Sequence, residues 1–194
     1  YVRFDELSCI FVCIPKNANS TINAMFFEKL DITYNKDDYQ SIHKVRQSMT
    51  VSKKFVQKHK EENFVYALTR NPYARLVAVY KNKIRSENHA LLNRYFSLFS
   101  KDMSFEQFVR TVCHIPTPLL ETHLKPQHIY LQSRKALLPH YIGKVENFNE
   151  DVQPLIDRFG LEPHEPMNVS SDTTSWEDWY TPELKALVYK KFKR

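Results

Sequence analysis

Glycine is nearly absent from this sequence, which has two glycines, Gly143 and Gly160, among 194 residues. The glycine-rich loops that cradle phosphates in many nucleotide-binding proteins, GxGxxG and GxxxxGK[ST], are therefore excluded. Any phosphate-binding loop in this chain has to form without glycine.

Cysteine is also scarce, and Cys9, Cys13 and Cys113 are odd in number and show no metal-ligand spacing. Cys9 and Cys13 lie in an apolar run and are expected to be core thiols in a reducing compartment. No grouping of His, Cys and carboxylates suggests a metal, so none is expected. No apolar run approaches the roughly 20 residues of a membrane span, and residues 1–5 lack the pattern of a signal peptide. We therefore expect no transmembrane segment in this chain.

The composition supports a folded core, because 42% of the residues are hydrophobic and 13% are aromatic. The length suits a single domain over residues 1–194. The net charge of +6 favours an anionic partner. Charge alone does not choose among a nucleotide, an acidic glycan, nucleic acid and a membrane surface.

Apolar runs alternate with helical patterns along the chain. Buried strands are predicted at residues 7–14, 39–45, 63–69 and 141–145, and helices at 50–59, 104–113, 147–159 and from residues 20, 72 and 181 onward. Ser104 and Thr181 are expected to cap their helices. This order predicts an α/β fold with a mainly parallel central sheet flanked by helices. Ligands of such sheets bind at the carboxyl ends of the strands.

The first loop of interest joins the strand at 7–14 to the helix that follows. A helix start presents free N–H groups and a positive dipole end to an anion, and Lys16 can reach over them. The hydroxyls of Ser20 and Thr21 either cap the helix or donate to a phosphate. Asn17 and Asn19 are expected to supply the left-handed backbone that glycine supplies elsewhere. The alternative is an ordinary capped helix beside an incidental lysine. The candidate binding residues are Pro15, Lys16, Asn17, Ala18, Asn19, Ser20 and Thr21.

The second loop follows the strand at 63–69, where Arg70 precedes a helix that begins near Pro72. A guanidinium can grip a phosphate through two parallel hydrogen bonds. Arg75, one turn into the helix, either helps to bind the phosphate or forms a structural salt bridge, which is the more common case at such a position. Two anion-binding loops at one sheet edge suggest a ligand with two separated phosphate groups.

These two loops, together with three later segments, resemble motifs of a known family. Pro15-Lys16-x-x-x-Ser20-Thr21 resembles the 5′-phosphosulfate loop of the sulfotransferases. Four further motifs, in order, resemble the Golgi-type carbohydrate sulfotransferases, especially the chondroitin and dermatan branch. They are Arg70-x-Pro72-x-x-Arg75-Leu76-x-x-x-Tyr80 with Asn82-Lys83, His123-x-x-Pro126-Gln127, Ile142-Gly143-Lys144-x-Glu146 with Asp151, and Tyr180-Thr181-Pro182-Glu183-Leu184 with Val188-Tyr189.

The resemblance implies a P-loop-nucleotide-hydrolase-like fold and 3′-phosphoadenosine 5′-phosphosulfate (PAPS) as the donor substrate, without a metal. Lys16 would stabilise the leaving oxygen, Ser20 and Thr21 would hold the 5′-phosphate, and Arg70 the 3′-phosphate. Ser170 would belong to a loop that closes over the nucleotide. The acceptor would offer a hydroxyl or amine, as a glycan or small hydroxylated molecule does, and no nucleic acid is expected as a partner. Residues 86–101 and 114–124 are candidate acceptor loops.

The sequence departs from the family pattern at two places. A serine usually stands eight residues after the motif arginine, where this chain has Ala78. The paired cysteines that tend to follow the His-x-x-Pro-Gln segment are missing from residues 130–135. The second departure favours a cytoplasmic, bacterial protein, whereas an excised eukaryotic domain would belong to the Golgi lumen.

Two histidines compete for the role of catalytic base, and a histidine near its ordinary pKa suits that role at neutral pH. His43 is narrowly preferred, because it lies near the end of the strand predicted at 39–45, at the sheet edge where the two loops converge. The resemblance also implies a catalytic base at a similar place after the first βα unit. His123 lies in a family motif. A basic run beside His43 is either a solvated face or a surface for an acidic glycan; its members are Lys44, Arg46, Lys53, Lys54 and Lys58.

Three other interpretations remain open. A nucleotide kinase would need the glycine-rich loop and magnesium ligands, which are missing. A non-catalytic basic module that binds nucleotide, acidic glycan or nucleic acid would explain the charge but not the ordered motifs. A degenerate sulfotransferase would bind the donor without turnover, and Ala78 keeps this interpretation open.

Overall fold

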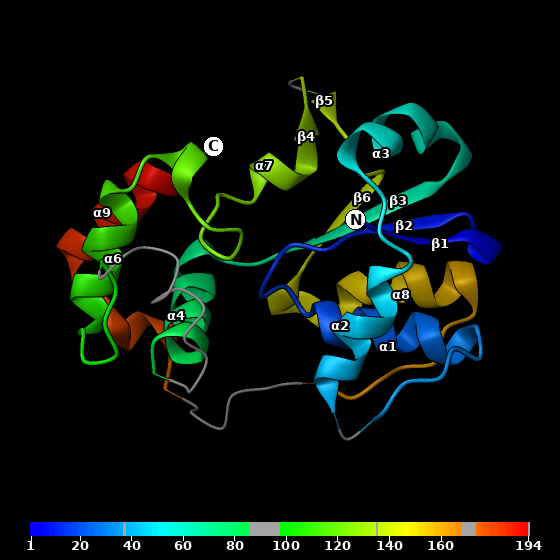
Figure 1. Cartoon of the computed structure of the whole chain (residues 1–194), viewed down its shortest axis with the longest axis horizontal. Helices are drawn as coiled ribbons and strands as arrows, with labels where there is room; N and C mark the ends of the chain where they lie inside the picture. The colour runs from blue at the N-terminus through cyan, green and yellow to red at the C-terminus, as the bar shows by residue number, and fades with distance from the viewer. Residues whose placement is uncertain (37, 86–97, 135, 168–173, 194) are drawn as a thin grey trace. The chain divides into compact units, whose positions relative to one another are not determined.

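The computed structural model describes residues 1–36, 38–85, 98–134, 136–167 and 174–193. The chain forms two compact units (Figure 1). Unit 1 comprises Tyr1–Thr69 and Ile129–Val169, and unit 2 comprises Arg70–His128 and Ser170–Arg194. A single domain over residues 1–194 stays a prediction.

Unit 1 is built on a four-stranded sheet in the order β1-β2-β3-β6. β2, β3 and β6 are parallel, whereas β1 runs antiparallel to β2. The mainly parallel sheet is thus confirmed, and the edge strand β1 was not predicted. The strands are β1 (Val2–Phe4), β2 (Cys9–Val12), β3 (Phe64–Thr69) and β6 (Tyr141–Lys144).

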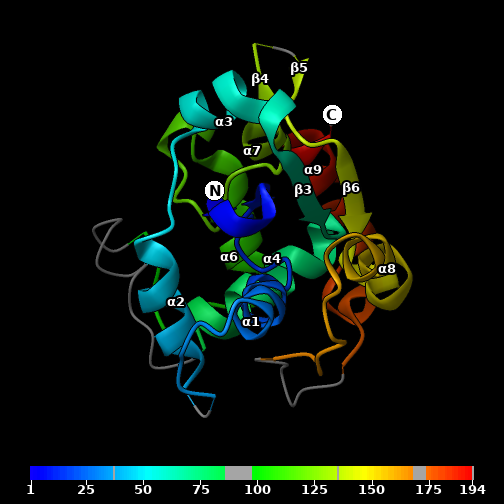
Figure 2. The ribbon, with the colours of Figure 1, turned by 90° about the vertical axis from the view of Figure 1, so that its right-hand side faces the viewer.

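Alternate residues of β2 and β3 face two separate cores, as the period of a strand requires. Phe11 and Tyr66 face α1 (Asn19–Lys29) and α8 (Phe148–Phe159), where Phe4 stacks on Phe26 at 4.2 Å between ring centroids. Ile10 and Val65 face the opposite core, which includes Val56 of α3 (Lys53–His59). Both layers are visible in Figure 1, and Figure 2 shows the unit from the side. Helices therefore cover both faces of the sheet.

The strand predicted at residues 39–45 is wrong, because this segment forms α2 (Tyr39–Gln47). Asp38 begins the helix by accepting a hydrogen bond from the Gln40 backbone N–H at 2.9 Å. Ile42 is fully buried and Val45 packs against the same core, which is helical spacing. Charged residues between them, such as Lys44, would be buried in an inner parallel strand, so the amphipathic helix prevails.

The remaining elements of unit 1 are short. They are the 3₁₀ turns η1 (Asp5–Leu7), η2 (Lys60–Glu62) and η4 (Val145–Asn147), and the hairpin of β4 (Gln132–Ser133) and β5 (Ala136–Leu137). The short helix α7 (His128–Leu131) contains the sequence border between the two units.

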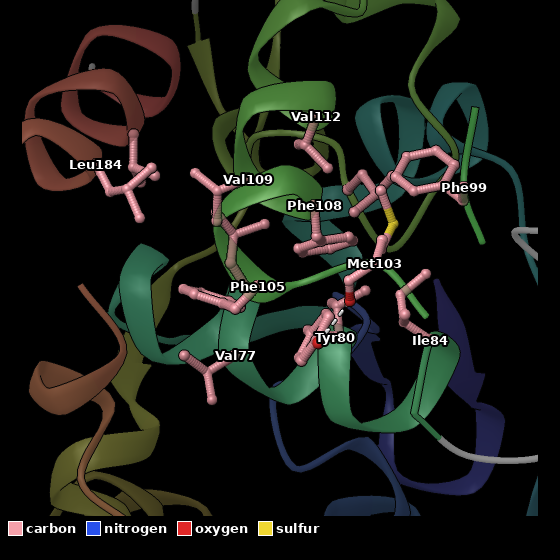
Figure 3. Close-up of a cluster of buried hydrophobic side chains, with 14 of the residues drawn as sticks. Val77, Tyr80, Ile84, Phe99, Met103, Phe105, Phe108, Val109, Val112 and Leu184 are labelled. Carbon is pink, nitrogen blue, oxygen red and sulfur yellow. Dashed lines mark hydrogen bonds between the residues drawn. The ribbon is translucent and has the colours of Figure 1, made fainter. Parts of the chain in front are cut away.

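Unit 2 is helical around an aromatic core (Figure 3). Phe105 and Phe108 of α6 pack on Tyr80 of α4, whose hydroxyl donates to the Met103 carbonyl at 2.8 Å. Ser104 and Thr181 cap their helices, as predicted. The elements are α4 (Pro72–Lys83), α6 (Phe105–His114), η3 (Thr117–Leu119), η5 (Trp176–Trp179) and α9 (Pro182–Phe192).

None of the helices in the described part of the chain has both the length and the apolar character needed to cross a bilayer. The compartment in which the protein resides stays a prediction.

Candidate functional site

The loop between β2 and α1 turns tightly at the carboxyl end of the sheet. The Asn17 backbone N–H donates to the Ile14 carbonyl at 3.2 Å, and two residues have left-handed backbones, Lys16 (φ 70°) and Ala18 (φ 55°). The prediction that Asn17 and Asn19 would adopt this conformation is wrong. Neither asparagine takes the left-handed conformation. The side chain of Asn17 is buried in the protein, and Asn19 is already the first residue of α1.

Asn17 is completely buried, and its Nδ2 donates to the Leu68 carbonyl at 2.7 Å. Leu68 is the residue before the last of β3, so this bond ties the loop to the carboxyl end of the neighbouring strand. A loop that lacks glycine is thus held in shape by a side chain.

The start of α1 has no side-chain cap. Ala18 occupies the cap position, where its methyl group cannot accept a hydrogen bond, and the first intrahelical bond runs from the Ile22 N–H to the Ala18 carbonyl at 3.1 Å. The N–H groups of Asn19, Ser20 and Thr21 therefore precede the helical ladder at the positive end of the dipole. The alternative in which Ser20 or Thr21 caps α1 is wrong, because both residues lie inside the first turn of the helix.

The Thr21 hydroxyl has a structural partner in unit 1. Its Oγ1 accepts a hydrogen bond from the Met167 backbone N–H at 3.0 Å, and the residue is 1% exposed. A hydroxyl oxygen that accepts one bond still has its hydrogen to donate. Thr21 can therefore anchor the segment before residue 168 and donate to an oxyanion.

α2 approaches this loop through Arg46. Burial raises the pKa of the Cys13 thiol, against a smaller opposite effect of the guanidinium of Arg46 and of Asn23, whose amide lies 4.0 Å from the sulfur. Arg46 therefore lies near Cys13, the residue that follows β2. His43 precedes Arg46 by three residues, so it lies on the same face of α2, one turn away.

In unit 2, the side chain of Gln127 clamps the backbone of Arg70. The Arg70 N–H donates to Gln127 Oε1 at 3.0 Å, and Gln127 Nε2 donates to the Arg70 carbonyl at 2.6 Å. Asn71 caps α4 by accepting from the Tyr73 N–H at 2.9 Å. The half-buried Arg70 is thus fixed at its main chain before the helix begins.

Arg75 is buried and binds the main chain. The residue is 1% exposed, and its Nη1 donates to the Lys125 carbonyl at 2.9 Å. Together, Arg75 and Gln127 hold the segment 121–127 on α4. Ala78 lies on the same helix and is half-buried.

The sequence of residues 1–187 matches the family model of the sulfotransferase family. This chain belongs to the sulfotransferase family. Comparison with curated proteins and comparison with solved structures each gave no match.

The predicted site residues of this sulfotransferase divide between the two units. Unit 1 contains His43 and the loop residues from Pro15 to Thr21, whereas unit 2 contains Arg70 and His123. Ser170 and residues 86–97 of the acceptor loop predicted at 86–101 lie outside the described residues. The part of the argument for His43 that rested on a strand is lost, because that segment is α2, whereas the part that rested on the family resemblance stays a prediction.

Two residues of this sulfotransferase were missed by sequence reasoning. Arg46 was assigned only to a basic run, although it lies near Cys13. Glu121 was not considered, although it stands two residues before His123 and contacts its ring at 3.0 Å. An acidic residue two positions before a candidate base is the sequence signal that could have identified Glu121. Over the described residues, no group of three or more His, Cys, Asp and Glu side chains is placed to hold a metal ion.

Proposed function

We propose that this sulfotransferase takes PAPS as its donor and transfers the sulfuryl group to a hydroxyl or amine of a glycan or a small hydroxylated molecule. The observation that carries the proposal is the loop after β2. It presents uncapped N–H groups at the start of α1, and Asn17 holds it to the end of β3. The order strand, loop, helix and parallel strand also favours a P-loop-nucleotide-hydrolase-like fold without the glycine-rich loop. The ordered motifs favour the chondroitin and dermatan branch of the family.

The reaction is an in-line displacement at sulfur, analogous to phosphoryl transfer. The acceptor oxygen or nitrogen forms a bond to sulfur while the bond from sulfur to the bridging oxygen breaks. The electron pair of the broken bond leaves with adenosine 3′,5′-bisphosphate. Lys16 neutralises charge on the leaving phosphate, together with the N–H groups of α1. Arg70 binds the 3′-phosphate, and His43 or His123 accepts the proton of the acceptor.

Calorimetric titration with adenosine 3′,5′-bisphosphate tests the donor site. We expect micromolar binding to the wild type, not matched by AMP or ATP, and a loss of about tenfold or more in Arg70→Ala and Lys16→Ala. Lys190→Ala is the matched control, because it removes one exposed positive charge from α9. A screen with radiolabelled PAPS would then identify the acceptor. No binding to the wild type at near-millimolar ligand would refute the proposal.

A second candidate function is a non-catalytic basic module. Residues 39–60 contain six lysines and arginines and no acidic residue, and Lys44, Lys54 and Lys58 are exposed. Such a surface binds polyanions mainly through counterion release, so its affinity would fall steeply with salt. Steep salt dependence of heparin or oligonucleotide binding, without any binding of adenosine 3′,5′-bisphosphate, would favour this function.

A further inference from the structure

The side chain of Glu121 holds both the backbone and the ring of His123. Its Oε2 accepts a hydrogen bond from the His123 backbone N–H at 2.7 Å, and both carboxylate oxygens lie 3.0 Å from Nδ1 of the ring. The hydroxyl of Thr122 donates to Oε1. The imidazole is therefore fixed relative to its own main chain.

The carboxyl group of Glu121 is ionised at neutral pH. Burial raises its pKa, but hydrogen bonds from His123 and Thr122 outweigh burial and bring the pKa down to about 2. Lys83 of α4 also lies near this carboxylate. Burial lowers the pKa of Lys83, and the negative charge of Glu121 acts in the opposite direction.

An ionised carboxylate can only accept hydrogen bonds. The ring nitrogen that faces it, Nδ1, must therefore carry the hydrogen when the imidazole of His123 is neutral. The other nitrogen, Nε2, then has a free lone pair, which is the arrangement by which a carboxylate prepares a histidine to act as a base.

The segment that bears this pair is anchored at its other end as well. Arg75 binds the Lys125 carbonyl, and Gln127 clamps the backbone of Arg70. The segment that contains His123 is thus held before the histidine by Glu121 and after it by the hydrogen bonds of Lys125 and Gln127. Because the ring is already held in one orientation, it loses little conformational entropy when it accepts a proton.

We propose that Glu121 is a positioning residue that holds His123 as the Nδ1–H tautomer, so that Nε2 of His123 is the base that accepts the acceptor's proton. The inference rests on the proposed sulfuryl transfer and selects His123 over His43. As the bond to sulfur forms, the acceptor's proton moves to Nε2, and the resulting imidazolium is stabilised by its charge-assisted Nδ1–H bond to Glu121. The proton later passes to solvent and restores the neutral ring.

The tautomer is measurable without turnover, by ¹⁵N nuclear magnetic resonance of the histidine rings with the signal of His123 assigned from the His123→Ala variant. In the wild type above the ring's titration range, we expect protonated Nδ1 and unprotonated Nε2. The opposite tautomer in the wild type would overturn the inference, whether or not the protein binds the donor. Donor binding, measured by calorimetry, separately tests the proposed function.

Kinetics of Glu121→Gln and His123→Ala test the role in the reaction. We expect kcat to fall by about 10- to 1000-fold, with KM for the acceptor and the affinity for adenosine 3′,5′-bisphosphate changed less than about twofold. Glu121→Asp should restore part of kcat, because it keeps the carboxylate. Lys190→Ala, which changes an exposed residue of α9, is the control and should keep kcat within about threefold. A normal kcat in Glu121→Gln, or a collapse of kcat only in His43→Ala, would overturn the inference.

Discussion

Asn17 connects two segments that are distant in sequence, and its position explains how a loop without glycine keeps its shape. The amide of Asn17 bonds to the carbonyl of Leu68, 51 residues later in the chain. The left-handed positions are taken by Lys16 and Ala18, which bear side chains. A non-glycine residue in this conformation costs about 1 kcal/mol or more, so the surrounding contacts have to offset that cost.

Replacing Asn17 with alanine should therefore destabilise the protein. The substitution leaves the buried Leu68 carbonyl without this donor and opens a small cavity, for an expected loss of about 1–3 kcal/mol in the free energy of unfolding. Urea denaturation followed by circular dichroism measures the change. Asn149→Ala on the exposed side of α8 is the control and should stay within about 0.5 kcal/mol of the wild type. Equal stability of Asn17→Ala and wild type would show that the bond to Leu68 contributes nothing.

At the scale of elements, α8 and β6 approach each other at Gly143. A Cβ atom at this position would lie 2.8 Å from the Cβ of Asp151 and 2.9 Å from Cδ2 of Leu68. Asp151 in turn accepts hydrogen bonds from the Lys144 N–H at 2.7 Å and from the Tyr141 hydroxyl at 3.2 Å. The Gly143 motif with Asp151, noticed in the sequence as a family resemblance, thus has a packing explanation.

The variant Gly143→Ala should push α8 away from the sheet. Overpacking at a contact this close costs about 1–3 kcal/mol, and we expect a lower melting temperature in thermal unfolding. Lys144→Ala is the neighbouring control, because Lys144 is exposed and its backbone bond to Asp151 remains. A melting temperature unchanged in Gly143→Ala would mean that α8 and β6 can separate without cost.

The elements differ in how far the sequence predicted them. Three helices that begin with a capping residue or a proline were predicted correctly, at Ser104, Pro72 and Thr181 with Pro182, whereas α2, which Asp38 caps, was not. These signals act within a single turn, so the local sequence contains them completely. The segment 39–45 was assigned to the wrong type of element, because a short apolar pattern fits a strand and a helix equally well. Packing of Ile42 in the core of unit 1 decided in favour of the helix.

At the scale of the whole molecule, charge is distributed unevenly between the units. Of 28 lysines and arginines, 14 fall in each unit, whereas of 22 acidic residues 14 fall in unit 1 and 8 in unit 2. Unit 1 is thus neutral, and the net charge of +6 belongs to unit 2, which contains Arg70. The net positive charge of the composition is therefore carried by unit 2, whereas in unit 1 the basic run at residues 39–60 is balanced by acidic residues elsewhere.

The stability of the whole protein should decline in acid partly through Glu121. Its pKa lies near 2 in the folded protein against an ordinary value of 4.5, so its stabilising effect is complete above pH 4.5 and is lost as the pH falls toward 2. The expected contribution is about 3 kcal/mol. Urea denaturation at several pH values between 6 and 2 should show this decline in the wild type and a weaker one in Glu121→Gln.

The control for this pH series is Glu162→Gln, which removes an exposed carboxylate of unit 1. Its decline in acid should match that of the wild type. If Glu121→Gln also matches the wild type across the series, the carboxylate of Glu121 is not stabilised by the folded protein.

By itself, the sequence determined the family, the α/β class and most of the elements, because sequence motifs and helix caps consist of residues that lie close together in the chain. It also identified the loop after β2 and Arg70 as candidate anion-binding positions. Only the tertiary structure decided that Asn17 binds β3, that Gln127 clamps Arg70 across 57 residues of chain, and that Glu121 rather than solvent faces Nδ1 of His123. These contacts depend on where the backbone brings side chains together and on which rotamers the packing allows, and no local pattern of residue types specifies either.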